Sequence, residues 1–269
     1  TNRLQKASRI PMLVSLDGEW GLSMRLSGTT RFPKNMMLGA IEDNALIEEY
    51  GKEVGRQCRE MGIHINFAPD MDVNSNVDNP VIGLRSFGEN PEAVAEKGIA
   101  YARGLESTGI LSVSKHFPGH GDTSEDSHNT LPSVHHDRAR LDSVELYPFR
   151  RYIYDGYAGV MTGHLYVPAL DKTRNLPSSL SRPIVTGLLK EELGFRGLCF
   201  TDALAMKGAT TSKLDNPSVK ALLAGNDILL APAAPINDFT AVKEAIDEGI
   251  LNIEDIEAKC IKILQYKYI

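Results

Sequence analysis

Most of the histidines of this chain fall in one short segment. The chain has seven histidines, and five of them lie between His116 and His136. The segment begins Lys115-His-Phe-Pro-Gly-His-Gly-Asp-Thr and continues Ser-Glu-Asp-Ser-His128. Its proline and two glycines favour a loop that can fold tightly or move. Imidazoles and carboxylates crowded on such a loop indicate chemistry, and they can be interpreted in three ways.

The first interpretation is a metal site, because zinc and iron both accept imidazole and carboxylate ligands. Its ligands would be His116, His120, Asp122, Asp126 and His128. The second is a solvated polar loop without chemistry. The third is acid/base catalysis by Asp126 and His128, which stand two positions apart. A carboxylate beside an imidazole holds one tautomer and raises the imidazole pKa, which suits a proton donor. The spacing alone leaves all three interpretations open.

Six short apolar runs, each followed by a helical pattern, must position this loop. They are Met12–Asp17, Ile63–Asp70, Ile110–His116, Ala158–His164, Gly197–Asp202 and Asp227–Ala231. Runs rich in Val, Ile and Leu are typical of strands buried on both faces, as in a parallel sheet. Between them we expect helices from Ile47 to Met61, from Asn90 onward, over Ser181–Leu193 and around Ile253–Ile263. The polar stretch Asp72–Gly88 is expected to be a functional loop.

Five of the six runs end in polar residues, namely Asp17, Asp70, Lys115-His116, His164 and Asp202. Alternating strands and helices predict an α/β fold, either doubly wound or barrel-shaped. No G-x-G-x-x-G fingerprint or Walker A sequence follows a strand, whereas barrel enzymes collect catalytic groups at the C-terminal ends of several strands. The sequence therefore predicts a (β/α)8 TIM-type barrel.

The barrel is expected to form one domain over residues 1–269, lacking its first one or two strands. The chain begins at Thr1 without an initiator Met or a signal peptide, so we expect a processed or truncated piece, and its compartment is not predicted.

Composition narrows the classes of function. The chain has 269 residues, 42% hydrophobic and 24% charged, with a formal net charge of −6. That charge argues against a nucleic-acid binder. The sequence contains no apolar run of about 18 residues, the length that a membrane-spanning helix needs. The cysteines Cys58, Cys199 and Cys260 are too few and scattered for a disulfide scaffold or zinc ribbon.

The loop closely resembles the signature of glycoside hydrolase family 3, in particular its bacterial β-N-acetylhexosaminidase branch. The resemblance rests on Lys-His-Phe-Pro-Gly-His-Gly-Asp-Thr followed by Asp-Ser-His and Leu131-Pro132. Further motifs similar to the family occur in its order along nearly the whole chain. They are Ser15-Leu-Asp-Gly-Glu-Trp-Gly21, Asn66-Phe-Ala-Pro-Asp70 with Asp72-Val, Gly83-Leu-Arg-Ser-Phe87, Met161-Thr-Gly-His164 and Phe200-Thr-Asp-Ala-Leu-Ala-Met-Lys-Gly-Ala209.

The resemblance implies a retaining exo-glycosidase that removes terminal β-linked N-acetylglucosamine from peptidoglycan- or chitin-derived saccharides. The family's nucleophile corresponds to Asp202, and its loop dyad to His128 as acid/base with Asp126 as partner. Substrate contacts carry over to Asp17, Arg25, Arg85, Lys115 and His116, with His164 lining the pocket. The implied partner is a small saccharide, and no metal or organic cofactor is implied.

Three alternatives remain. A β-glucosidase or β-xylosidase of the same family would take a carboxylic acid from a later domain, and we expect none after the last helix. A barrel that lacks strands could instead bind saccharides without catalysis, and the loop could serve a metal hydrolase. Trp20 stands where the family usually has glycine, so it either stacks on sugar or narrows the pocket. His135 and His136 match no family element and are expected at the surface, while Met161 and Met206 are expected to pack.

Overall fold

The computed structural model describes residues 1–127, 130–209 and 216–268. Five parallel strands pair in chain order to form one sheet. They are β1 (Ser15–Leu16), β2 (Ile65–Asn66), β3 (Leu111–Phe117), β4 (Gly159–Thr162) and β5 (Leu198–Thr201). The sixth predicted run contributes an isolated parallel bridge between Phe200 and Ile228. This arrangement confirms the predicted fold class: the five parallel strands form part of a (β/α) barrel.

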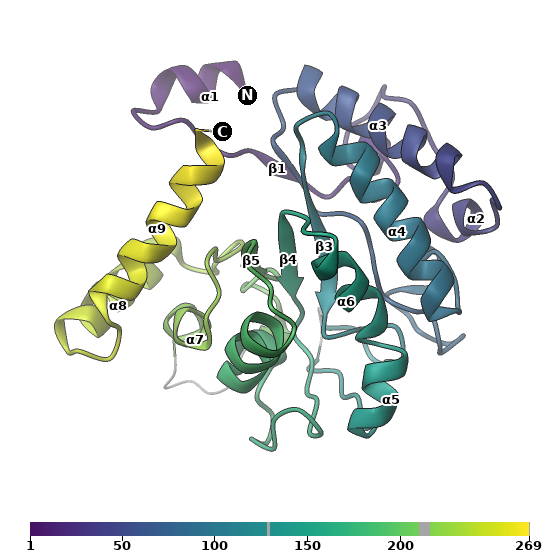
Figure 1. Cartoon of the computed structure of the whole chain (residues 1–269). Helices are drawn as coiled ribbons and strands as arrows, with labels where there is room; N and C mark the ends of the chain where they lie inside the picture. The colour runs from purple at the N-terminus through teal and green to yellow at the C-terminus, as the bar shows by residue number, and fades with distance from the viewer. Residues whose placement is uncertain (128–129, 210–215, 269) are drawn as a thin grey trace.

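Helices follow the strands and pack around the sheet (Figure 1). The α-helices are α1 (Asn2–Ala7), α2 (Asn35–Gly39), α3 (Asn44–Glu60), α4 (Pro91–Glu106), α5 (Arg138–Ser143), α6 (Tyr147–Tyr154), α7 (Pro217–Ala224), α8 (Pro235–Asp247) and α9 (Ile253–Lys267). Short 3-10 segments are η1 (Leu22–Met24), η2 (Gly83–Arg85), η3 (Ser178–Leu180) and η5 (Lys207–Ala209), and η4 (Pro183–Glu192) is π-helical. None of the described helices has the length and apolar character that crossing a membrane requires.

Both faces of the sheet are covered, which explains the near-continuous apolar runs. On the inner face, Phe67 of the β2 region meets Phe200 of β5 edge-on, with ring centroids 5.5 Å apart. Ile263 and Tyr266 of α9 pack against the same inner cluster. The outer face packs against α4, α6 and η4. Apolar side chains therefore occupy most of both faces, while the charged side chains of the predicted site stand at or just after the strand ends.

Two of the predicted helices, α3 and α4, form where the sequence indicated. The Asn90 side chain accepts hydrogen bonds from the amides of Glu92 and Ala93, so α4 begins where the sequence indicated. Helix α3 buries Val54 and Cys58 of the predicted stripe, although Met61 at its end is 47% exposed. The structure also contains α1, α2, α5, α6, α7 and α8, for which the sequence analysis gave no ranges.

Helices α3 and α4 lie side by side (Figure 1) and approach closely at glycines. A Cβ on Gly51 would lie 2.3 Å from the Tyr101 carbonyl oxygen, and one on Gly104 would lie 2.0 Å from that of Glu48. These distances fall far inside van der Waals contact and involve backbone, which has little freedom to move. Gly51 and Gly104 therefore determine how closely α3 packs on α4, the helix that covers the sheet.

Gly104→Ala is expected to lower the free energy of unfolding by about 1–3 kcal/mol, because overpacking outweighs the better helix propensity of alanine. Gly187→Ala in η4 is the matched control, since nothing lies within 4 Å of its Cβ position. It should be neutral or stabilising by up to about 1 kcal/mol. Urea unfolding of both variants measures the difference, and equal midpoints would contradict the packing argument.

Candidate active site

The carboxyl ends of the strands surround a cavity of about 410 Å³. Predicted site residues from four separate chain regions line it, namely Asp17, Arg25, Arg85, Lys115, His116 and Asp202. Parallel strands end at the same edge of a sheet, so residues far apart in sequence meet there. The structure therefore brings most of the predicted substrate contacts and the predicted nucleophile into one hollow.

Lys115, in β3, is the buried cation of this cavity, with only 2% of its side chain exposed. Its Nζ lies 2.8 Å from Asp17 Oδ1 and 2.7 Å from Glu19 Oε1. Burial would lower the Lys115 pKa, but Glu19 and then Asp17 outweigh it and raise the pKa. The ammonium is thus kept charged by two carboxylates on the loop that follows β1.

Glu19 also holds Arg85 in a two-pronged ion pair. Arg85 Nε lies 3.0 Å from Glu19 Oε2, and Arg85 Nη2 lies 2.8 Å from Glu19 Oε1. The Glu19 side chain has no exposure, yet its pKa is lowered, because Lys115 and Arg85 overcome the desolvation that would raise it. The sequence analysis quoted Glu19 within a motif but gave it no role, since a sequence does not report burial between two cations.

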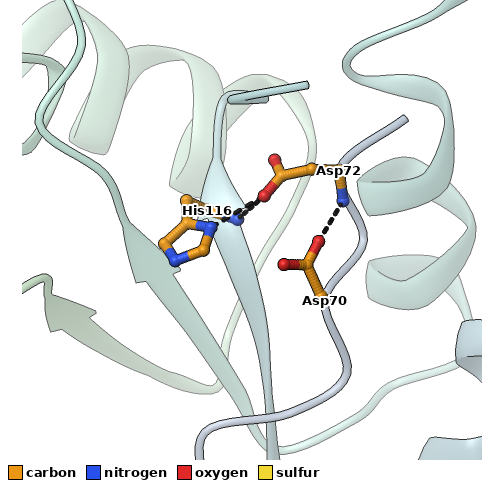
Figure 2. A group of neighbouring side chains, drawn as sticks. All are labelled: Asp70, Asp72 and His116. Atoms are coloured by element: carbon orange, nitrogen blue, oxygen red, sulfur yellow. Dashed lines mark hydrogen bonds and ion pairs between the residues drawn. The ribbon is translucent and has the colours of Figure 1, made fainter. Parts of the chain in front are cut away.

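His116 is held by partners at both ring nitrogens, of which Figure 2 shows Asp72. Its Nδ1 lies 2.7 Å from Asp72 Oδ2, and its Nε2 lies 3.2 Å from Arg85 Nη2. Guanidinium can only donate, so Nε2 accepts and Nδ1–H donates to Asp72. Burial and then Arg85 lower the His116 pKa to about 4, consistent with this neutral tautomer. Arg85 is therefore a partner of the site and not a surface charge.

Asp70 and Asp72 lie together beside His116 (Figure 2). Asp72 Oδ1 accepts from the His120 amide at 2.7 Å, and Asp70 Oδ1 accepts from the Asp72 amide at 3.0 Å. The other Asp70 oxygen has no hydrogen-bond partner. Burial and the neighbouring Asp72 raise the Asp70 pKa well above its ordinary value. These three residues have ligand-type atoms within reach of one ion, but the adjacent Arg85 and the fully engaged Asp72 disfavour a cation.

Asp202 follows β5 and is partly exposed to the cavity. Its amide donates to the Thr162 carbonyl at 2.8 Å, and its Oδ1 accepts from the Ala203 amide at 2.7 Å. Burial would raise its pKa, but nearby His116 and His164, the Ala203 amide and Lys115 lower it overall. The carboxylate is thus fixed on its strand end and kept ionised.

His164 lies behind the cavity and not in its wall, which corrects the expected pocket-lining position. Its side chain is fully buried, with Nδ1 2.7 Å from Ser179 Oγ and Nε2 3.1 Å from the Ala203 carbonyl oxygen. Both ring nitrogens are therefore used within the protein. The position suits support for the Asp202–Ala203 turn better than contact with a ligand.

The histidine-rich loop reaches the same cavity through Ser127, which lines it. The loop is anchored by His120, whose Nδ1 lies 2.7 Å from Thr123 Oγ1 and whose Nε2 lies 3.2 Å from Ser127 Oγ. The Gly208 amide donates to the Ser127 carbonyl at 3.1 Å. Asp126 is partly exposed beside Ser127, and the predicted acid/base His128 lies outside the described residues.

Arg25 borders the cavity, whereas Trp20 does not. Arg25 Nη2 lies 3.2 Å from Asp17 Oδ2, with 48% of the arginine side chain exposed. Lys34 Nζ lies 5.4 Å from the ring centroid of Trp20. Met161 is buried as expected, but it also touches the cavity.

Comparisons with known proteins agree with this geometry. The profile of the glycosyl hydrolase family 3 N-terminal domain matches residues 1–266. The chain belongs to glycosyl hydrolase family 3. It is 36% identical to β-hexosaminidase A of Pseudoalteromonas piscicida over 99% of this chain and 50% of that protein.

Among solved structures, the chain is similar to a family 3 β-N-acetylglucosaminidase from Paenibacillus sp. str. FPU-7. The TM-score is 0.94 at 40% identity, covering 99% of this chain and 52% of that one. A β-glucoside phosphorylase, BglX, aligns with a TM-score of 0.92 at 28% identity, covering 99% and 50%. The chain spans about half the length of these relatives.

Glu19→Gln is expected to destabilise the protein by about 3–5 kcal/mol, because two buried cations lose their shared anion. Glu48→Gln is the control, since the Glu48–Arg103 pair is solvent-exposed and should cost no more than about 1 kcal/mol. Denaturant unfolding at low and high salt measures both. A loss for Glu19→Gln no larger than for the control would contradict the role of the buried cluster.

Asp70→Asn tests the raised pKa of Asp70. A carboxyl group whose folded pKa exceeds its unfolded pKa stabilises the fold at low pH, and that contribution is lost as pH rises through the folded pKa. The variant should therefore gain stability relative to the parent as pH increases from about 4 to 8. Unfolding midpoints across this range provide the measurement, and a pH-independent difference would refute the assignment.

Proposed function

We propose that this chain carries the catalytic barrel of a retaining β-N-acetylhexosaminidase, which removes terminal β-linked N-acetylglucosamine. The observation that carries the proposal is that Asp202 and Ser127, the neighbour of His128, face one cavity. That cavity also holds the predicted sugar contacts. The relatives named β-hexosaminidase and β-N-acetylglucosaminidase support the choice of sugar.

Asp202 is the proposed nucleophile. Glycoside cleavage passes through an oxocarbenium-like transition state, and a retaining enzyme needs a carboxylate on one face of the sugar ring. The lowered pKa of Asp202 keeps the carboxylate charged, and its bond to the Ala203 amide fixes its direction. Its attack on the anomeric carbon would give a glycosyl ester that water then hydrolyses.

His128, with Asp126 as its partner, is the proposed acid/base. One proton must reach the leaving oxygen in the first step and one must leave water in the second. The loop is anchored at Ser127, which lines the cavity, and His128 is the next residue in the sequence. An imidazole can perform both transfers near neutral pH because its ordinary pKa is about 6.5.

The charged side chains of Asp17, Lys115 and Arg85, which line the cavity, are the proposed contacts to the terminal sugar. Asp17 can accept from two hydroxyls, while Lys115 and Arg85 can donate to sugar oxygens. Asp17 is held by Lys115 on one oxygen and Arg25 on the other, so its carboxylate is oriented before sugar binds. The natural saccharide is proposed to derive from peptidoglycan or chitin.

Asp202→Asn is expected to lower kcat for an aryl N-acetylglucosaminide by at least about 10³-fold, since the nucleophile is removed while the fold is kept. A slow fluorinated N-acetylglucosaminyl fluoride should label the parent protein on the peptide carrying Asp202. Peptide mass spectrometry provides the measurement. Labelling on any other peptide would refute the assignment.

His128→Ala is expected to reduce turnover of substrates with poor leaving groups by about 10²–10⁴-fold, and turnover of activated aryl glycosides much less. Equal losses on both substrate types would count against His128 as the acid/base.

Product analysis of the parent protein with water alone and with added phosphate separates hydrolysis from phosphorolysis, which the similarity to BglX makes necessary. Sugar binding without turnover in the parent would instead favour a saccharide-binding barrel.

A further inference from the structure

A second cluster of ligand-type side chains lies outside the cavity. It consists of Asp122, His136 and Glu145, whose carboxylate oxygens and ring nitrogen lie within 4.8 Å of one another. Asp122 belongs to the histidine-rich loop, His136 to the segment before α5, and Glu145 to the connection between α5 and α6. Asp122 and His136 Nε2 are in direct contact. The cluster thus joins the base of the loop to the barrel's outer helices.

Glu145 is the unusual member, because 98% of its side chain is buried while one of its carboxylate oxygens has no partner. Its Oε1 accepts from Arg140 Nη2 at 3.1 Å, and its Oε2 makes no hydrogen bond. A buried acceptor without a partner destabilises the fold, because its lost hydration is not replaced. Glu145 cannot easily turn away, because it packs under the loop, where a Cβ on Gly119 would lie 2.7 Å from its Cβ.

We propose that Asp122, His136 and Glu145 bind one divalent cation of the zinc type. One imidazole and two carboxylates are ligands that Zn²⁺ accepts at about 2.0–2.2 Å. The ligand atoms of the three residues already lie within 4.8 Å of one another. The ion would enter where Asp122 and His136 Nε2 are now in contact. The carboxylates of Asp122 and Glu145 would balance the charge of the dication. Glu145 Oε1 keeps its bond to Arg140 Nη2, which leaves the unpartnered Oε2 for the ion.

Such an ion would clamp the loop that carries Asp126 and His128. Asp122 stands four residues before Asp126, and the next anchors along the loop are His120–Thr123 and His120–Ser127. A metal ligand at Asp122 would add a rigid link from the loop to α5 and α6. The site is separate from the proposed nucleophile, so its occupancy would act on loop position and not on the reacting carboxylate.

Calorimetric titration of the full chain with zinc chloride tests the site without using glycosidase activity. We expect one ion per chain with a Kd in the micromolar range or below, and at least tenfold weaker binding in His136→Asn and Glu145→Gln. His135→Asn is the matched control, because this exposed neighbour is not in the cluster and should leave the Kd unchanged. Failure of the parent to bind zinc, or equal binding by all variants, would overturn the proposal.

Two controls separate loss of the site from loss of the fold. Asp122→Asn keeps the shape of the side chain and should weaken binding as the other ligand variants do, with unchanged circular dichroism. Cobalt substituted for zinc should give a visible absorption band that His136→Asn abolishes and His135→Asn keeps. Binding that survives His136→Asn but disappears in His116→Asn would place the ion in the cavity and refute the site proposed here.

Discussion

The buried ion cluster of Glu19, Lys115 and Arg85 is the constraint on which the rest of the cavity depends. Two cations share one carboxylate that has no exposure to water, so each of the three charges would be costly without the other two. Glu19 thereby fixes the head groups of Lys115 and Arg85, which come from β3 and from the loop after β2. Side chains placed in this way need little reordering when a polar ligand arrives.

The cluster also determines the state of its neighbours. Burial and the guanidinium of Arg85 keep the His116 imidazole neutral; Arg85 donates to its Nε2, and its Nδ1–H donates to Asp72. Asp202 follows β5, and its pKa is lowered against the effect of burial by His116, His164, the Ala203 amide and Lys115, so its carboxylate is ionised. A chain of fixed charges therefore runs across several strand ends, and it gives a single carboxylate at β5 the properties that nucleophilic attack requires.

Much of this arrangement could be predicted from the sequence, because it follows from patterns one element long. Apolar runs that end in Asp17, Lys115-His116 and Asp202 marked the strands and their catalytic edge, and Asn90 marked the start of α4. The roles of Glu19 and Asp72 could not be predicted, since these depend on which cations and imidazoles tertiary packing places beside them. His164 was misplaced for the same reason: a polar strand end can point into the cavity or toward Ser179, and only packing decides.

His136 illustrates the limit most clearly. Its position beside His135 suggested two surface imidazoles, and only His135 is exposed. His136 turns inward because α5 and α6 bring Glu145 beneath the loop while Asp122 approaches from the other side. The loop is thus tied at its base and has polar anchors at His120 and Ser127 nearer the cavity. The two-step displacement proposed above needs a nucleophile that holds one position while a proton carrier serves first the leaving group and then water. The fixed strand end of Asp202 and the anchored loop before His128 fit these two needs.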